Sequence, residues 1–129
     1  MYGEVILEHS RHPRNYGSLE SPDLRHEHDN PLCGDRVRIE MSLAPDGSVR
    51  AARFQGDLCA IAKAASSLLT EMLTGMTLEE ASSITHQRMV ETLRDEIPQS
   101  RLPCAHLPLD VVHAAIAEYR SSQCTSREP

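Results

Sequence analysis

The sequence predicts an α+β fold, in which a small antiparallel sheet is covered by several helices. Apolar residues recur with a period of two across residues 37–55, and with a helical period both before and after that stretch. Helices that flank a hairpin, and do not alternate with strands, are typical of this class. The chain has 129 residues, the length of a single domain, and only 3% of them are aromatic, so the core is expected to be aliphatic.

The first elements expected along the chain are a short helix and one weak strand. Apolar and aromatic positions in residues 2–10 recur at helical spacing, and the helix is expected to stop before Pro13. Residues 18–34 are mainly polar, so only a weak strand is expected there, near residues 24–28.

A hairpin and a long helix occupy the middle of the predicted fold. Strict alternation of apolar and polar residues predicts a half-buried strand over residues 37–43. The turn Pro45-Asp46-Gly47 then returns the chain as its partner strand over residues 49–55. From Cys59 the pattern becomes helical, and this helix is expected to end near Gly75, a residue suited to a C-terminal cap.

Three further helices are expected in the C-terminal half. The segment Thr77–Glu80 has the pattern of a capping box and begins a short helix, and Thr85 can cap another. A last helix is expected to follow Pro103. Pro108 would lie in its first turn, where a missing backbone N–H costs little.

Composition and charge narrow the function classes. The net charge is −6 and the arginines do not form a basic run interleaved with aromatics, which disfavours nucleic-acid binding. No apolar run approaches the ~20 residues of a membrane span, and residues 1–15 lack the apolar stretch of a signal peptide. We therefore expect a cytoplasmic protein that does not bind membranes, with one domain over residues 1–120 and a flexible tail over residues 121–129.

Four cysteines are the most informative residues, and they stand too far apart for a local C-x-x-C site. Reduced thiols in a cytosolic chain more often ligate metal or react than form disulfides. Cys33 precedes the hairpin, whereas Cys59 and Cys104 begin helices, where unpaired N–H groups and the helix dipole favour the thiolate. Cys124 is expected to be incidental. A site made from the other three has to be assembled by the fold.

Charged neighbours of these cysteines are candidates for the same site. Asp35, in the segment C-G-D, could ligate the same metal or simply cap a turn. Lys63 lies four residues after Cys59, so it is either a cation beside the thiolate or a solvated lysine. Arg101 is another candidate cation, and His106 is a weaker candidate ligand.

Four segments together resemble a known family. Residues 31–36 read P-L-C-G-D-R, residues 54–67 read F-Q-G-D-L-C-A-I-A-K-A-A-S-S, and residues 101–105 read R-L-P-C-A. Residues 12–17, which read H-P-R-N-Y-G, precede them. In this order the segments resemble the IscU/NifU N-terminal/SufU family of iron–sulfur cluster assembly proteins, over about residues 1–120.

This resemblance implies a three-stranded antiparallel sheet with helices, and a site formed by Cys33, Asp35, Cys59 and Cys104. It implies a scaffold, and not an enzyme, that accepts sulfur from a cysteine desulfurase, builds a labile [2Fe–2S] cluster on these residues and passes it to apo-proteins. Three thiolates and one weaker oxygen ligand suit iron–sulfide, and they suit zinc in the isolated protein. Cys104 and Cys33 are the candidate persulfide acceptors, with Lys63 as a thiolate stabiliser.

Departures from the family pattern leave alternatives open. Pro103 precedes Cys104 where the IscU branch has His, and residues 97–101 read I-P-Q-S-R instead of L-P-P-V-K, so an Hsp70-type chaperone is not expected to bind there. The C-G-D-R and R-x-x-C-A segments are similar to the SufU branch of zinc-dependent sulfur acceptors, although the interval from Cys59 to Cys104 is too short for that branch's insertion. The alternatives are a SufU-like sulfurtransferase and a purely structural zinc module.

Overall fold

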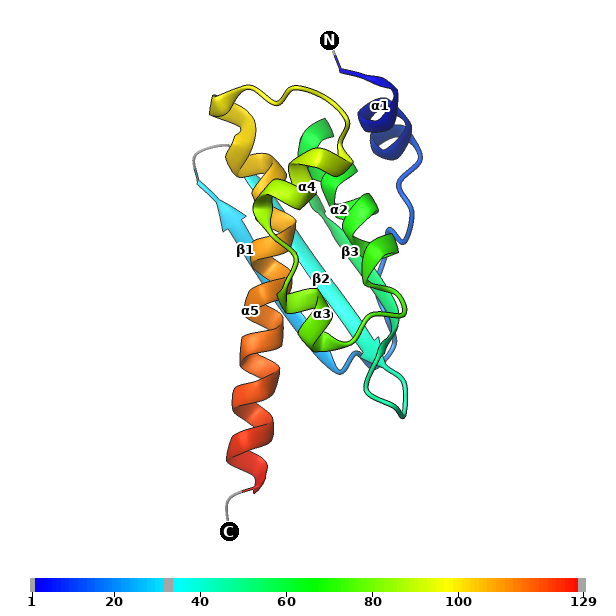
Figure 1. Cartoon of the computed structure of the whole chain (residues 1–129), viewed down its shortest axis with the longest axis vertical. Coiled ribbons are helices and arrows are strands. Elements are labelled where there is room, and N and C mark those ends of the chain that lie inside the picture. Colours follow the sequence, from blue (N-terminus) through cyan, green and yellow to red (C-terminus); the bar gives the residue numbers. More distant parts are fainter. Residues whose placement is uncertain (1, 32–33, 128–129) are drawn as a thin grey trace.

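The computed structural model describes residues 2–31 and 34–127 and has the α+β architecture that the sequence predicts (Figure 1). Cys33, one of the expected site residues, lies outside the described residues. None of the helices over these ranges is both long and apolar enough to cross a membrane. The elements follow in the order α1 (Glu4–Arg11), β1 (Leu24–Asn30), β2 (Asp35–Leu43), β3 (Val49–Asp57), α2 (Ala60–Leu73), α3 (Leu78–Ser82), α4 (His86–Thr92), a 3₁₀ turn η1 (Gln99–Arg101) and α5 (Leu102–Arg127).

The three strands form one antiparallel sheet in the order β1-β2-β3. The apolar positions of the predicted alternation are confirmed, because Val37, Ile39 and Met41 of β2 are fully buried. The polar positions are not all exposed, since Glu40 and Ser42 are buried as well, at 4% and 7%. The weak strand expected before the hairpin is a seven-residue strand that pairs with β2 along its whole length. At the other side of β2, Val37 pairs with Gly56 of β3. The end of the sheet beside this pair carries Asp35, the first residue of β2.

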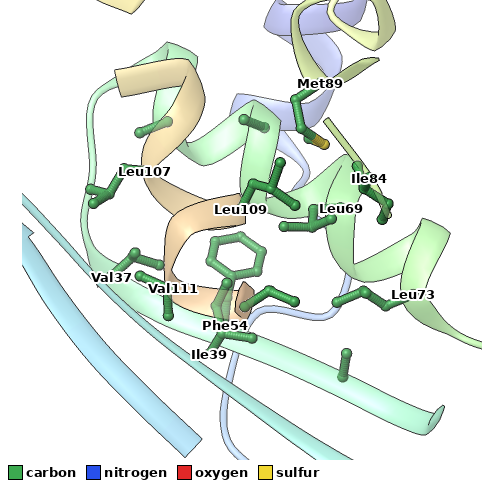
Figure 2. Close-up of a cluster of buried hydrophobic side chains, with 14 of the residues drawn as sticks. Val37, Ile39, Phe54, Leu69, Leu73, Ile84, Met89, Leu107, Leu109 and Val111 are labelled. Carbon is green, nitrogen blue, oxygen red and sulfur yellow. The ribbon is translucent and has the colours of Figure 1, made fainter. Parts of the chain in front are cut away.

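The core lies between one face of the sheet and the helices α2 and α5 (Figures 1 and 2). Figure 2 shows Phe54 of β3 surrounded by aliphatic side chains from β2, α2 and α5. Removing one such side chain from water stabilises the fold by roughly 1.5–3 kcal/mol. The expectation of an aliphatic core is therefore confirmed. Phe54 is its aromatic member among the described residues.

The chain that follows α1 is fixed to α2 and then to β3. The hydroxyl of Ser67, a buried residue of α2, accepts the backbone N–H of Arg14 at 2.9 Å. Further on, Phe54 donates its N–H to the Asn15 carbonyl at 3.0 Å, and Gly17 donates to the Phe54 carbonyl at 2.8 Å. The predicted loop between the first helix and the sheet is therefore bound along the edge strand β3.

The helix starts predicted from capping residues are confirmed. The Thr77 hydroxyl accepts the Glu80 N–H, and the Glu80 carboxylate accepts the Thr77 N–H, so the capping box opens α3. Thr85 caps α4 in the same way, by accepting the N–H of Arg88 at 3.0 Å. Each such cap contributes about 1 kcal/mol to helix stability.

The prediction for Pro108 is wrong. The turn η1 leads into α5, which begins at Leu102 and not after Pro103, so Pro108 lies inside the helix, beyond its first turn. Because proline has no N–H, Pro108 cannot donate to the carbonyl of Cys104, four residues earlier. At its other end α5 continues to Arg127, into the segment expected to be a tail.

Candidate metal centre

Two thiols and a carboxylate from three different elements meet at one end of the sheet. One ligand atom from each of Asp35, Cys59 and Cys104 can be chosen so that all three atoms lie within 4.8 Å of one another. Asp35 is the first residue of β2, Cys59 is the N-cap of α2, and Cys104 lies in the first turn of α5. The fold thus brings together residues that are 24 and 45 positions apart along the chain.

Asp35 is held in place by a backbone hydrogen bond. Its Oδ1 accepts the N–H of Cys59 at 2.9 Å, and only 4% of the residue is exposed. This contact ties the start of β2 to the junction of β3 and α2. A carboxylate has about four lone-pair positions, so it can keep this hydrogen bond while another lone pair ligates a metal ion.

Cys59 is placed by helix capping. Its Sγ accepts the N–H of Ala62 at 3.5 Å, at the start of α2. We expected this position to favour the thiolate, and for Cys59 that expectation is wrong. Burial, with a smaller contribution from Asp35, raises the pKa of the Cys59 thiol and outweighs the Ala62 hydrogen bond, which lowers it. Cys59 therefore holds its proton more tightly than an ordinary cysteine, and metal binding has to release that proton.

This shift predicts how the alkylation of Cys59 depends on pH. The thiolate is the reactive form, so iodoacetamide labelling of metal-free protein is expected to rise with pH around a midpoint above that of an ordinary cysteine. Because Asp35 contributes to raising the pKa, the Asp35→Asn variant is expected to have a lower midpoint. Mass spectrometry of the Cys59 peptide over a pH series measures both. A wild-type midpoint at or below that of a free cysteine would contradict the burial argument.

Cys104 is fully buried and lies next to a cation. The guanidinium of the exposed Arg101 hydrogen-bonds to the Cys104 sulfur, and this contact, with attraction to Cys59, raises the pKa of Arg101. The sequence suggested Arg101 as a candidate cation only because it stands three residues before Cys104. The structure shows that this spacing brings the positive charge to the sulfur.

Other residues suggested by the sequence do not join this group. Lys63 donates its backbone N–H to the Cys59 carbonyl at 2.9 Å, but its ammonium is not among the groups that shift the Cys59 pKa. Its role as a thiolate stabiliser stays a prediction. His106 stacks on His86 of α4, with ring centroids 4.2 Å apart, and lies outside the group of three. Burial, with the charge of His86, lowers the pKa of His106.

The donor set suits soft or borderline metal ions. Thiolates favour zinc and iron–sulfur clusters, whereas a site for magnesium or calcium would consist of oxygen atoms. Two sulfur atoms and one carboxylate leave room for a fourth ligand in a tetrahedral arrangement. The residues present therefore fit zinc or an iron–sulfide cluster. The resemblance seen in the sequence assigns the remaining position to Cys33.

Fold and donor set together define a class of small α+β domain with a thiol–carboxylate site at one end of a three-stranded sheet. The NifU-like N-terminal domain family matches residues 1–126. The chain therefore belongs to the NifU-like N-terminal domain family.

Curated relatives match over nearly the whole chain. The iron–sulfur cluster assembly scaffold protein IscU of Haemophilus influenzae is 35% identical over 125 residues, which cover 95% of this chain and 98% of the relative. IscU of Escherichia coli K12 is 34% identical over 125 residues, with 95% and 96% covered. The mitochondrial iron sulfur cluster assembly protein 1 of Schizosaccharomyces pombe is 37% identical, with 97% of this chain and 66% of the relative covered.

Solved structures share the fold at lower sequence identity. A NifU-like protein (N-terminal) from Brucella abortus superposes with a TM-score of 0.76 at 22% identity, over 92% of this chain and 94% of that one. A candidate iron–sulfur cluster assembly scaffold of the SUF system from Fervidobacterium islandicum has a TM-score of 0.73, also at 22% identity, over 89% and 96%. The expected fold class is thereby confirmed.

Proposed function

We propose that this protein is an iron–sulfur cluster assembly scaffold that builds a labile cluster on Cys33, Asp35, Cys59 and Cys104. The observation that carries the proposal is the convergence of one carboxylate and two thiols, from β2, α2 and α5, within 4.8 Å. Relatives of about 35% identity that bear the name of such scaffolds support it. Its partners would be a cysteine desulfurase, as sulfur donor, and apo-proteins that receive the cluster.

The mixed ligand set explains how a scaffold could release what it builds. Thiolates bind iron strongly, whereas a carboxylate oxygen is a harder and weaker ligand for an iron–sulfide cluster. Asp35 also accepts a hydrogen bond from Cys59, so its oxygen atoms are shared between the protein and the cluster. Asp35 is therefore the ligand that an acceptor protein would displace first.

Sulfur would reach the site by thiol–persulfide exchange. A thiolate of Cys104 or Cys33 attacks the outer sulfur of the desulfurase persulfide, a new S–S bond forms, and the donor's S–S bond breaks. The donor cysteine leaves as a thiolate, so one thiolate is consumed and one is produced. The positive charge of Arg101, hydrogen-bonded to Cys104, would stabilise the anionic sulfur at the start of this step.

A zinc-dependent sulfur acceptor is the second candidate, because the same sulfur and oxygen donors form a tetrahedral zinc site. In this version zinc occupies the site in the resting protein, and one thiol leaves it to take sulfur. The protein would then stimulate desulfurase turnover without holding a cluster.

Anaerobic reconstitution with ferrous iron, L-cysteine and a cysteine desulfurase tests the proposal. A scaffold is expected to develop sulfur-to-iron charge-transfer absorbance that Cys104→Ser loses and Cys124→Ser, the matched cysteine control, keeps. Desulfurase turnover is measured in parallel for zinc-loaded and zinc-free protein. If desulfurase turnover rises strongly only with the zinc-loaded protein, and no charge-transfer absorbance develops, the scaffold proposal is wrong and the sulfur acceptor is favoured. Absorbance that survives Cys104→Ser would contradict the assigned site.

A further inference from the structure

A second group of metal-ligating side chains lies between α4 and α5, apart from the thiols. The imidazole rings of His86 and His106 stack in parallel, with centroids 4.2 Å apart and an angle of 11° between their planes. His86 Nε2 lies 2.6 Å from Oδ1 of Asp110. The two His side chains and the carboxylate thus share one small patch of the surface.

The sequence and the fold both contribute to this arrangement. His106 and Asp110 are four residues apart in α5, so they lie on the same face of that helix, one turn apart. His86 is the first residue of α4, and the Thr85 cap fixes where that helix begins, against α5. About half of each side chain of His86 and Asp110 is exposed, at 46% and 51%, so neither is needed to fill the core.

A surface hollow gives solvent access to two of these three side chains, those of His106 and Asp110. It has a volume of about 340 Å³, and its lining includes His28, Pro31, Pro103, His106 and Asp110. An ion from solution can therefore reach the imidazole of His106 and the carboxylate of Asp110 without any movement of the backbone.

We propose that His86, His106 and Asp110 form a second metal site, which takes a divalent transition-metal ion through two imidazole nitrogens and one carboxylate oxygen. Imidazole ligands select zinc, cobalt, nickel or ferrous iron over magnesium and calcium. The site has no thiolate, so it differs in chemistry from the Asp35–Cys59–Cys104 group. The proposal does not depend on the scaffold function.

The side chains have to rotate before all three can bind one ion. Over residues 2–31 and 34–123, the group of three donor atoms that already lie within 4.8 Å of one another is that of Asp35, Cys59 and Cys104. The Asp110 carboxylate pairs with His86 in the structure. The half-exposed side chains of His86 and Asp110 can change rotamer rapidly, so their pair can open, and the ring of His86 can turn out of its stack on His106, to admit a shared ion.

Cobalt(II) is the probe that separates the two sites. Cobalt bound to thiolates gives intense sulfur-to-metal charge-transfer absorbance, whereas cobalt bound to imidazole and carboxylate gives only weak ligand-field bands. Equilibrium dialysis of the wild-type chain is expected to show two cobalt ions per chain, one of each kind. His86→Asn and Asp110→Asn are each expected to weaken the thiolate-free ion at least about tenfold, since even outer-shell partners contribute this much, and to leave the charge-transfer bands unchanged.

The control is His12→Gln, which removes an exposed imidazole from the loop after α1. It is expected to bind cobalt as the wild type does. Far-UV circular dichroism checks that each variant keeps its fold. A wild type whose bound cobalt all shows charge-transfer bands, at one ion per chain, would overturn the second site, and so would equal binding by His86→Asn and His12→Gln. A wild type that binds one cobalt ion without charge-transfer bands would instead count against the thiol site and leave this inference standing.

Discussion

Replacing Cys59 with serine is expected to abolish tight zinc binding while leaving the metal-free fold intact. The Cys59 sulfur has two roles, as a donor in the Asp35–Cys59–Cys104 group and as the N-cap of α2. Serine is a preferred N-cap residue, so its hydroxyl can accept the Ala62 N–H. It does not ionise at neutral pH, however, and it offers zinc no thiolate. The substitution therefore removes the ligand and keeps the cap.

The expected loss of zinc affinity is at least about a hundredfold, because a direct ligand should matter as much as the strongest outer-shell partners. Competition with a chromophoric chelator measures it. The free energy of unfolding of the metal-free protein should change by less than about 0.5 kcal/mol, as for a substitution that breaks no packing. Cys124→Ser is the matched control and should alter neither quantity. Unchanged zinc affinity in Cys59→Ser would remove Cys59 from the site.

Among glycine-to-alanine substitutions at the described glycines, Gly56→Ala is expected to destabilise the fold most. Gly56 has a φ of 152°, and a Cβ there would lie 1.9 Å from the carbonyl oxygen of Arg36 and 2.9 Å from its carbonyl carbon. Both are backbone atoms of the neighbouring strand, so β2 and β3 would have to separate. The expected loss is about 3 kcal/mol, the upper range for backbone strain at one residue, measured by urea denaturation.

The same substitution is expected to weaken metal binding, because the strained pair lies beside the site. Gly56 pairs with Val37, two residues after Asp35, and Cys59 follows Gly56 by three residues. Separating the strands here would stretch the hydrogen bond from Cys59 to Asp35. Gly47→Ala is the matched control: its φ is 90°, but a Cβ would meet no atom within 4 Å, so only about 1 kcal/mol of backbone strain is expected. Equal losses in the two variants would refute the steric argument.

Local features of this fold could be predicted from the sequence because they depend on neighbouring residues. The alternation around Val37 and Ile39, and the caps at Thr77 and Thr85, are short-range patterns, and the structure confirms them. The start of α5 could not be predicted, since the pattern gave no sign of the η1 turn that carries the helix back to Leu102. Pro108 was misplaced for that reason.

The three site residues that the structure describes could be named from the sequence, but the protonation of Cys59 could not. The positions of Cys59 and Cys104 at helix starts, and of Asp35 in the segment C-G-D, made them candidates, and the family resemblance placed them in one site. The position of Cys59 before a helix suggested a stabilised thiolate, but burial, which depends on the whole fold, reverses the shift. The contact of His86 with His106 could not be predicted from the sequence either, because it depends on how α4 packs against α5.

X-ray absorption at the zinc edge, on protein loaded with one zinc ion per chain, tests most directly whether the fold builds one thiol–carboxylate centre. Three sulfur atoms at about 2.3 Å and one oxygen atom at about 2.0–2.2 Å are expected for wild-type protein. In Cys59→Ser, zinc that remains bound should have lost one sulfur. A wild-type shell of nitrogen and oxygen atoms, without sulfur, would contradict the assignment of the centre to these cysteines.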